Sequence, residues 1–190
     1  SSGSADLIRE LDALGTNLLT VEAGQSFGTG SSSLPVDAPA RIRRIDPVYE
    51  VAAVSKISGG VYRSDLIDEG RTQGLTIIAA DLNLLDAQRG SISQGQYLTP
   101  ALQNFPTVVL GAVAAERLGI AELSTDRSIW LGGEWFVVVG ILNPLPLAAD
   151  LDRAAIIGYP AAERFLDYEY EPDIIYVRAY AEHVLNVRSV

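Results

Sequence analysis

A pair of adjacent glycines between two apolar runs is the feature that most constrains how this chain folds. Gly132 and Gly133 lie inside the segment 127–142, and the residues on both sides of them are rich in the β-branched and aromatic types that favour strands. Consecutive glycines readily adopt the positive φ angles of a tight two-residue turn. The sequence therefore predicts an antiparallel β-hairpin, with Trp130 and Trp135 packed against each other across its strands.

The hairpin is followed by a break. Pro144 and Pro146 cannot donate hydrogen bonds to a β-ladder, so the second strand is expected to end before them. Asp150 and Asp152 lie in the same break, and paired carboxylates can bind a divalent cation or act as acid and base. An Asp-x-Asp pair without a third ligand is also common in solvated turns. We favour a hinge-like connector over residues 143–153, and a metal-dependent enzyme using the two aspartates stays open as an alternative.

The remaining patterns predict short strands mixed with short helices. Asp81 is expected to cap a short helix that runs through Leu84 and Leu85. The expected strands are 16–24, two strands within 48–65 that form a hairpin around Gly59 and Gly60, 75–81, 108–110, 154–159 and 173–180. The expected helices are 5–14, 40–45, 112–118, 160–166 and one that begins at 181. Because no regular βαβ alternation occurs, the predicted fold class is α+β.

Composition excludes several classes of function. About half of the 190 residues are apolar (48%), which is enough for a sizeable core, and the formal charge of −10 disfavours nucleic acid or an anionic lipid surface as a partner. The chain has no cysteine, so disulfides, thiolate catalysis and zinc–thiolate sites are excluded. No apolar run approaches the ~20 residues of a membrane-spanning helix. Because methionine is absent even at position 1, we expect the chain to be either a processed protein or an excised fragment of a longer one.

Residues that could carry catalysis are few and scattered. His183 is the single histidine and Lys56 the single lysine, and neither has neighbours in the sequence that would make a triad, a metal site or a Schiff-base pocket. No nucleophile elbow, phosphate-binding loop or dinucleotide-binding motif occurs. We therefore predict that the chain is not an enzyme and has no catalytic, cofactor-binding or metal-binding residues.

A free-standing extracellular binding module is a further alternative. Its contact surface would be the glycine- and serine-rich loop 27–33 or a second group of acidic residues, which comprises Glu169, Glu171 and Asp173.

Three motifs, in this order, resemble the extracytoplasmic domain of MacB/FtsX-like ABC transporter permeases, the type VII or mechanotransmission group. The first is Leu-Gly-Thr-Asn at residues 14–17, which in that family follows the first transmembrane helix. The second is the strand-to-helix segment 108–119, and the third is the Val-Val-Gly-Ile-Leu strand 138–142. The resemblance extends from about Leu11 to Ala179.

The resemblance implies a two-part domain and a function without catalysis. Residues 1–80 and 151–190 would form a porter-like α/β subdomain with an N-terminal stalk helix, and residues 81–150 an inserted, β-rich, sabre-like subdomain. The domain would couple ATP-driven motion of transmembrane helices to export, lipoprotein release or activation of a partner outside the membrane. The implied partners are the protein's own transmembrane helices, an ABC ATPase, a second copy in a homodimeric transporter, and an extracytoplasmic protein. The implied location is the periplasmic or extracellular side of the cell membrane.

Overall fold

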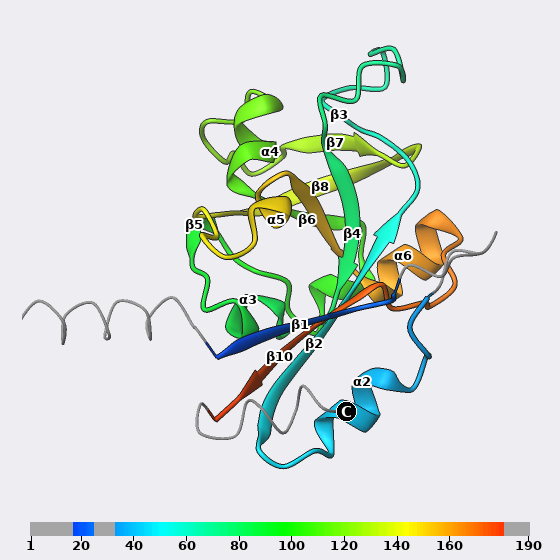
Figure 1. Ribbon diagram of the computed structural model, residues 1–190. Helices are drawn as coiled ribbons and strands as arrows, with labels where there is room; N and C mark the ends of the chain where they lie inside the picture. Colours follow the sequence, from blue (N-terminus) through cyan, green and yellow to red (C-terminus); the bar gives the residue numbers. More distant parts are fainter. Residues whose placement is uncertain (1–16, 25–32, 181–190) are drawn as a thin grey trace, which may run out of the picture.

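A single mixed β-sheet lies at the centre of the computed structural model, which describes residues 17–24 and 33–180 (Figure 1). In this part of the chain ten strands pair in the order β1-β10-β2-β4-β9-β6-β8-β7-β3, with β5 paired to β8. The strands are β1 Leu18–Glu22, β2 Val48–Ile57, β3 Val61–Tyr62, β4 Thr76–Ala80, β5 Ile92–Gly95, β6 Thr107–Leu110, β7 Ser128–Leu131, β8 Glu134–Leu142, β9 Ala154–Gly158 and β10 Ile174–Ala179.

Short helices cover both faces of this sheet. They are α2 Ala38–Arg43, α3 Leu84–Ala87, the 3-10 helix η1 Leu102–Asn104, α4 Ala112–Arg117, α5 Ala149–Asp152 and α6 Tyr159–Leu166. Two pairs of strands, β4 with β9 and β6 with β8, are parallel, and the others are antiparallel. The mixed sheet and the absence of regular crossover helices confirm the predicted α+β class.

The alternation of side chains along the strands divides the core between the two faces. On one face, apolar residues of β4, β6, β7, β8 and β9 pack against α4 and α6, and Val51, Ile175 and Val177 pack against α2. On the other face, residues such as Ile78 and Ile156 pack against α3 and against the segment before and through α5. The sheet is thus a rigid plate with both faces buried over most of its width.

The predicted hairpin over 127–142 is confirmed. β7 and β8 pair antiparallel with Trp130 opposite Trp135, and the two ring centroids are 5.2 Å apart in an edge-to-face arrangement. Gly132 and Gly133 have φ angles of 59° and 85°, which residues with a side chain adopt only with strain.

The predicted hairpin around Gly59 and Gly60 is wrong, although both of its strands exist. The last residues of β2, Val54 to Ile57, pair with β4, and its earlier residues, Val48 to Val54, pair with β10, so β2 has other partners than β3. The chain instead carries β3 to the far end of the sheet, where it pairs with β7 and where the carbonyl of Gly60 accepts a hydrogen bond from the N–H of Gly132 (3.0 Å).

The predicted helix cap at Asp81 is also wrong. The helix α3 begins at Leu84, and its N-cap residue is Asn83. The carboxylate of Asp81 instead accepts a hydrogen bond from the backbone N–H of Ala53 in the neighbouring strand (2.8 Å). Asp81 therefore ties β4 to β2 rather than starting a helix.

The other predicted elements are confirmed where the structure describes them. β1, β4, β9 and β10 lie within the expected strand segments, β6 begins one residue before its expected segment, and α2, α4 and α6 overlap the expected helices. The expected helices 5–14 and 181 onward lie outside the described residues. Across residues 17–24 and 33–180 no helix has the length and apolar character needed to cross a bilayer.

Candidate functional site

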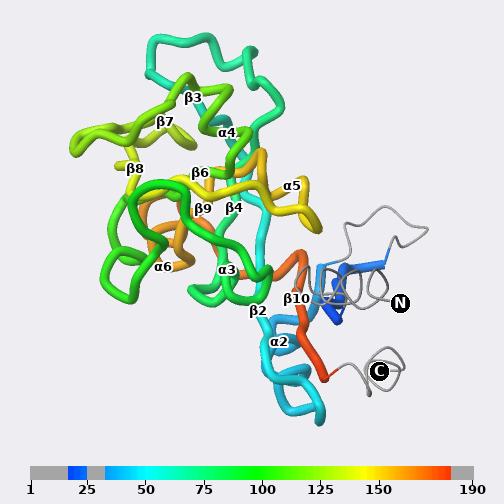
Figure 2. The backbone as a smooth tube through the Cα atoms, turned by 90° about the vertical axis from the view of Figure 1, so that its left-hand side faces the viewer, coloured from blue at the N-terminus to red at the C-terminus, as the bar shows by residue number. Residues whose placement is uncertain are grey.

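The described chain enters the sheet through β1 and leaves it through β10, and these strands are hydrogen-bonded neighbours at one edge. They run antiparallel with Leu18 opposite Arg178 and Glu22 opposite Ile174. The start of β1 and the end of β10 therefore lie together at one corner of the domain, far from the loop that follows β3 (Figures 1 and 2).

Asn17 binds the end of β10 with both ends of its amide. Its Nδ2 donates to the backbone oxygen of Ala179 at 2.8 Å, and its Oδ1 accepts from Nη1 of Arg178 at 2.8 Å. Asn17 is the last residue of the Leu-Gly-Thr-Asn motif, and it comes directly before β1. An asparagine suits this position because its amide both donates and accepts.

Arg178 lies on the inner side of this junction and is only 1% exposed. Its Nε donates to the backbone oxygen of Ala87 in α3 at 2.7 Å, and its Nη2 has no hydrogen-bond partner among the described residues. Burial lowers the pKa of the guanidinium, and the nearby Arg89 lowers that pKa further. The group nevertheless stays charged near neutral pH, because the ordinary pKa of arginine lies above 12.

We call this arrangement of Asn17, Arg178 and the Ala87 carbonyl the Asn17–Arg178 tie. It joins the residue before β1, the end of β10 and the helix α3, and β10 is itself held by β2 in the sheet. Between the two strand ends the tie therefore places one charge-assisted hydrogen bond, from Arg178 to Asn17, and one neutral bond, from Asn17 to Ala179.

The aspartates of the predicted connector are held in a structural turn. Asp152 Oδ1 accepts a hydrogen bond from the backbone N–H of Leu145 at 2.8 Å, which closes the segment before α5. Asp150 is exposed and faces Tyr176, whose pKa burial raises to about 12 with a further contribution from Asp150. Within residues 17–24 and 33–180 no group of three histidines, cysteines or acids is arranged to hold a metal ion. Motion at this connector stays a prediction.

The other candidates from the sequence are dispersed. Lys56 is exposed near the end of β2, where its backbone N–H donates to Asp173 Oδ2 at 2.7 Å. The backbone oxygen of Glu171 accepts from the buried hydroxyl of Ser55 at 2.8 Å, and Glu169 is exposed. His183 and residues 27–32 of the loop lie outside the described residues. The acidic group thus contributes main-chain and side-chain hydrogen bonds to the end of β2.

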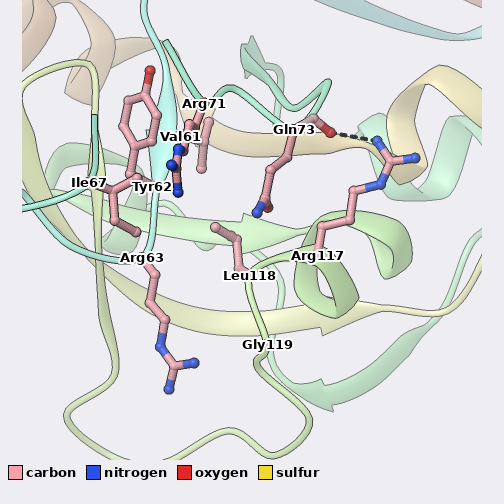
Figure 3. A pocket seen from close by; sticks show the side chains of 9 residues that line it. All are labelled: Val61, Tyr62, Arg63, Ile67, Arg71, Gln73, Arg117, Leu118 and Gly119. Carbon is pink, nitrogen blue, oxygen red and sulfur yellow. Dashed lines mark hydrogen bonds between the residues drawn. The ribbon is translucent and has the colours of Figure 1, made fainter. Parts of the chain in front are cut away.

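A pocket of about 190 Å³ lies at the opposite end of the sheet, between the loop 63–75 and the end of α4 (Figure 3). Sequence analysis did not predict it. Three arginines line it together with apolar and polar residues, and the full set is Val61, Tyr62, Arg63, Ile67, Arg71, Gln73, Arg117, Leu118 and Gly119.

A family model decides what kind of domain this is. Residues 2–184 match the model described as "MacB-like periplasmic core domain". The chain belongs to the MacB-like periplasmic core domain family. This domain is accordingly the periplasmic or extracellular region of a MacB-like ABC transporter permease, which confirms the resemblance drawn from the three motifs and the location expected from them.

Solved structures show the same fold in other MacB-like domains. The periplasmic region of MacB from Actinobacillus actinomycetemcomitans matches with a TM-score of 0.71 at 16% identity, over 97% of this chain and 85% of that one. The extracellular domain of the noncanonic ABC-type transporter YknZ from Gram-positive bacteria matches with a TM-score of 0.65 at 14% identity, over 90% of this chain and 86% of that one. A domain of a putative permease protein from Porphyromonas gingivalis matches with a TM-score of 0.56 at 14% identity, over 90% and 78% of the two chains.

No curated protein sequence matches the chain significantly. The family match therefore establishes that the chain is the extracytoplasmic domain of a permease, and its mechanism has to be inferred from the geometry of the domain.

Proposed function

We propose that this domain couples ATP-driven movement of its own transmembrane helices to an event outside the membrane, without catalysing a reaction itself. The observation that carries the proposal is the Asn17–Arg178 tie. It fastens together the two places where the described chain enters and leaves the sheet. Transmembrane helices that follow from these two places would act on one stiff corner of the domain.

The sheet behind the tie is suited to transmit such movement. β1 pairs with β10 over five residues, and β10 pairs with β2 over six. The two strands next to the tie contain buried residues such as Ile175 and Val177, which pack against α2. Packed interiors resist compression, so a displacement at one edge moves the plate as a body instead of deforming it locally.

The proposal includes the partners implied by the family. They are the protein's own transmembrane helices, an ABC ATPase, and a second copy in a homodimeric transporter. An extracytoplasmic protein would receive the movement, and the output would be export, lipoprotein release or activation of that partner.

We also propose the two-part division, with residues 1–80 and 151–190 as the porter-like subdomain and residues 81–150 as the sabre-like insertion. The junction between β9 and β6 supports it, because these strands share only two residue pairs, whereas β4 and β9 share five. β3 belongs to the first part by sequence but pairs with β7 of the second. The sheet and one core cluster continue across the boundary, so the two parts would move as joined bodies.

Energy transfer between the domain and the bilayer tests the coupling. The full-length transporter, with any cysteine outside this chain replaced, receives one cysteine at the exposed Thr125 between α4 and β7 and a donor dye. It is reconstituted into nanodiscs that contain an acceptor-labelled lipid. We expect the transfer efficiency to change when ATP and vanadate trap the ATPase, because the domain moves relative to the membrane.

The variant Arg178→Met isolates the role of the tie. Methionine fills a similar volume without hydrogen bonds, so the variant removes the tie while the space under α3 stays filled. We expect ATP hydrolysis to continue and the change in transfer efficiency to shrink. Arg44→Met is the matched control, because Arg44 is exposed and its replacement by methionine removes the same charge. An unchanged transfer signal in wild type under ATP and vanadate, or a full signal in Arg178→Met, would contradict the proposal.

A further inference from the structure

The loop between β3 and β4 forms a structured tip at the end of the sheet opposite the Asn17–Arg178 tie (Figures 1 and 2). Three backbone hydrogen bonds fold it into successive turns: Ile67 N to Ser64 O at 3.4 Å, Arg71 N to Asp68 O at 2.9 Å, and Leu75 N to Thr72 O at 3.1 Å. The buried side chain of Tyr62 donates from its hydroxyl to the backbone oxygen of Glu69. The loop is therefore held in one shape.

Two apolar side chains project from this loop. Leu66 is 91% exposed and Ile67 is 37% exposed. Burying such side chains against a partner would be favourable, since apolar surface removed from water contributes about 25 cal/mol per Å². Ile67 also lines the pocket shown in Figure 3, so apolar surface and pocket form one continuous surface.

Three arginines are among the residues that line this pocket, and their guanidinium groups lie apart from one another (Figure 3). Arg63 and Arg71 come from the loop and Arg117 from the end of α4 (Figure 3). None of the three makes an ion pair with any residue in the part of the chain that the structure describes. Nη1 of Arg117 donates to the backbone oxygen of Gln73 at 2.6 Å, which fixes that arginine at the pocket edge and leaves its other N–H groups available.

The loop also has three acidic residues, and none of them makes an ion pair with these arginines. Asp65, Asp68 and Glu69 are exposed, none of them lines the pocket, and Oδ1 of Asp68 accepts from the N–H of Gly70 at 3.0 Å. A chain with a formal charge of −10 thus places three arginines without ion pairs among its described residues at one concave surface. Each of these cationic side chains can attract an anionic group of a ligand.

The volume of the pocket limits what enters it. At about 190 Å³ it is smaller than the ~300–1,000 Å³ of typical small-molecule sites, and it fits a single carboxylate side chain. Arginine binds carboxylates through paired N–H groups and is enriched at the energetic centres of protein interfaces. A neighbouring apolar residue of the same ligand would cover Leu66 or Ile67.

We propose that the pocket and the loop 63–75 form a docking site for a partner protein segment that presents a glutamate or aspartate next to an apolar residue. A protein is favoured over a lipid surface because the loop lies far from the strand ends that lead toward the membrane. This orientation rests on the proposed function. The carboxylate enters between the arginines, and the apolar neighbour packs on the exposed tip.

Fluorescence anisotropy with the full-length transporter in nanodiscs tests the site. The probe is a fluorescein-labelled Glu-Leu-Glu-Leu peptide, and the matched peptide is Gln-Leu-Gln-Leu, which has the same shape without the charges. We expect the acidic peptide to bind, the neutral peptide to bind at least roughly tenfold more weakly, and added salt to weaken the acidic peptide's binding.

Charge reversals locate the binding site. Arg71→Glu and, separately, Arg63→Glu are expected to weaken binding of the acidic peptide by roughly tenfold or more, because each replaces an attraction by a repulsion. Arg44→Glu, an exposed site in the segment after α2, makes the same charge change and is expected to leave binding unchanged. An unchanged melting temperature in each variant separates lost binding from lost folding.

Four outcomes would overturn the proposal. Equal binding of the two peptides, or no effect of both reversals, would show that the arginines do not recognise a carboxylate. Displacement of the acidic peptide by inorganic phosphate at the same concentration would assign the pocket to a small anion. Binding to vesicles of phosphatidylcholine and phosphatidylglycerol that Arg71→Glu abolishes, without peptide binding, would assign it to lipid. The peptide assay needs no ATP, so its failure is distinct from loss of the ATP-dependent energy-transfer signal.

Discussion

Replacing Asn17 by alanine should destabilise the domain through two hydrogen bonds at once. The variant removes the donor that reaches the backbone oxygen of Ala179 and the acceptor that receives Nη1 of Arg178, both at 2.8 Å. Arg178 cannot turn to water for a replacement, because it is 1% exposed and its Nε is already bound to Ala87. Nη1 then joins Nη2 as a buried charged donor without a partner in the described part of the chain.

The size of the effect follows from the kind of bond. A hydrogen bond to a charged group contributes about 1.5–3 kcal/mol, and an ordinary one contributes about 1 kcal/mol. Asn17 is half-buried, so water replaces part of the bond to Ala179. We therefore expect Asn17→Ala to lower the free energy of unfolding by about 3 kcal/mol. For a domain of this size this corresponds to a fall in melting temperature of roughly 6–12 °C.

Urea denaturation followed by tryptophan fluorescence measures this change, because Trp130 and Trp135 pack together in the hairpin. Asn17→Asp is the informative companion, since its carboxylate still accepts from Arg178 while the donor to Ala179 is lost. It should recover most of the stability near neutral pH. A loss below about 0.5 kcal/mol in Asn17→Ala, typical of an ordinary surface substitution, would refute the idea that the tie holds the two strand ends together.

Three further predictions concern the sheet and the connector. Burial raises the pKa of Asp81, and this effect outweighs the lowering effects of the Ala53 N–H and Arg43. At pH values just above the ordinary pKa of aspartate, the folded state therefore binds more protons than the unfolded state. The free energy of unfolding then falls as pH rises through this range. Asp81→Asn removes this fall, and the difference in free energy of unfolding should grow in favour of the variant as pH rises above the ordinary aspartate pKa of about 3.9. Gly111→Ala would place its Cβ 2.3 Å from the backbone oxygen of Leu151, and urea unfolding should show a loss of about 3 kcal/mol. Asp152→Ala leaves the backbone N–H of Leu145 without its acceptor and should lower the free energy of unfolding by about 1 kcal/mol. Calorimetry should detect no binding of calcium or magnesium to the wild type or to the variant. Binding heat that the variant abolishes would instead support the metal-dependent enzyme.

Elements governed by local signals were predictable from the sequence. The hairpin over 127–142 needed only strand-forming residues on both sides of a glycine pair, and α6 needed only Pro160 near its first turn and an apolar face. The strand-to-helix change at Gly111 was equally local. In each case the residues that decide the structure are neighbours along the chain.

Predictions failed where distant strands compete for the same partner. Nothing near Gly59 and Gly60 reveals that β2 will have β10 and β4 on its two sides, so a hairpin with β3 seemed possible. Asp81 has the side chain of a good helix cap, but a backbone N–H from β2 lies within its reach once the sheet is formed. Both errors come from pairing across the sheet, which local patterns do not encode.

The candidate site was missed for the same reason, although one signal was present. Asn17 and Arg178 are 161 residues apart, and only the pairing of β1 with β10 brings them together. Arg178 does stand out as a single charge in the otherwise apolar strand Ile174–Ala179. A charged residue at a position whose strand neighbours are buried requires partners of its own, and that requirement points to a specific contact.

The choice of arginine at position 178 argues for a mechanical role over a purely stabilising one. An apolar side chain of similar volume would fill the space under α3 without the cost of removing a charge from water, and such replacements are often neutral or stabilising. An apolar side chain could not form directional hydrogen bonds. Nε and Nη1 of Arg178 donate to the Ala87 carbonyl and the Asn17 amide, which belong to separate segments of the chain. Directional bonds fix how those segments lie relative to β10, and the proposed transmission of movement through two adjacent strand ends requires that fixed relation.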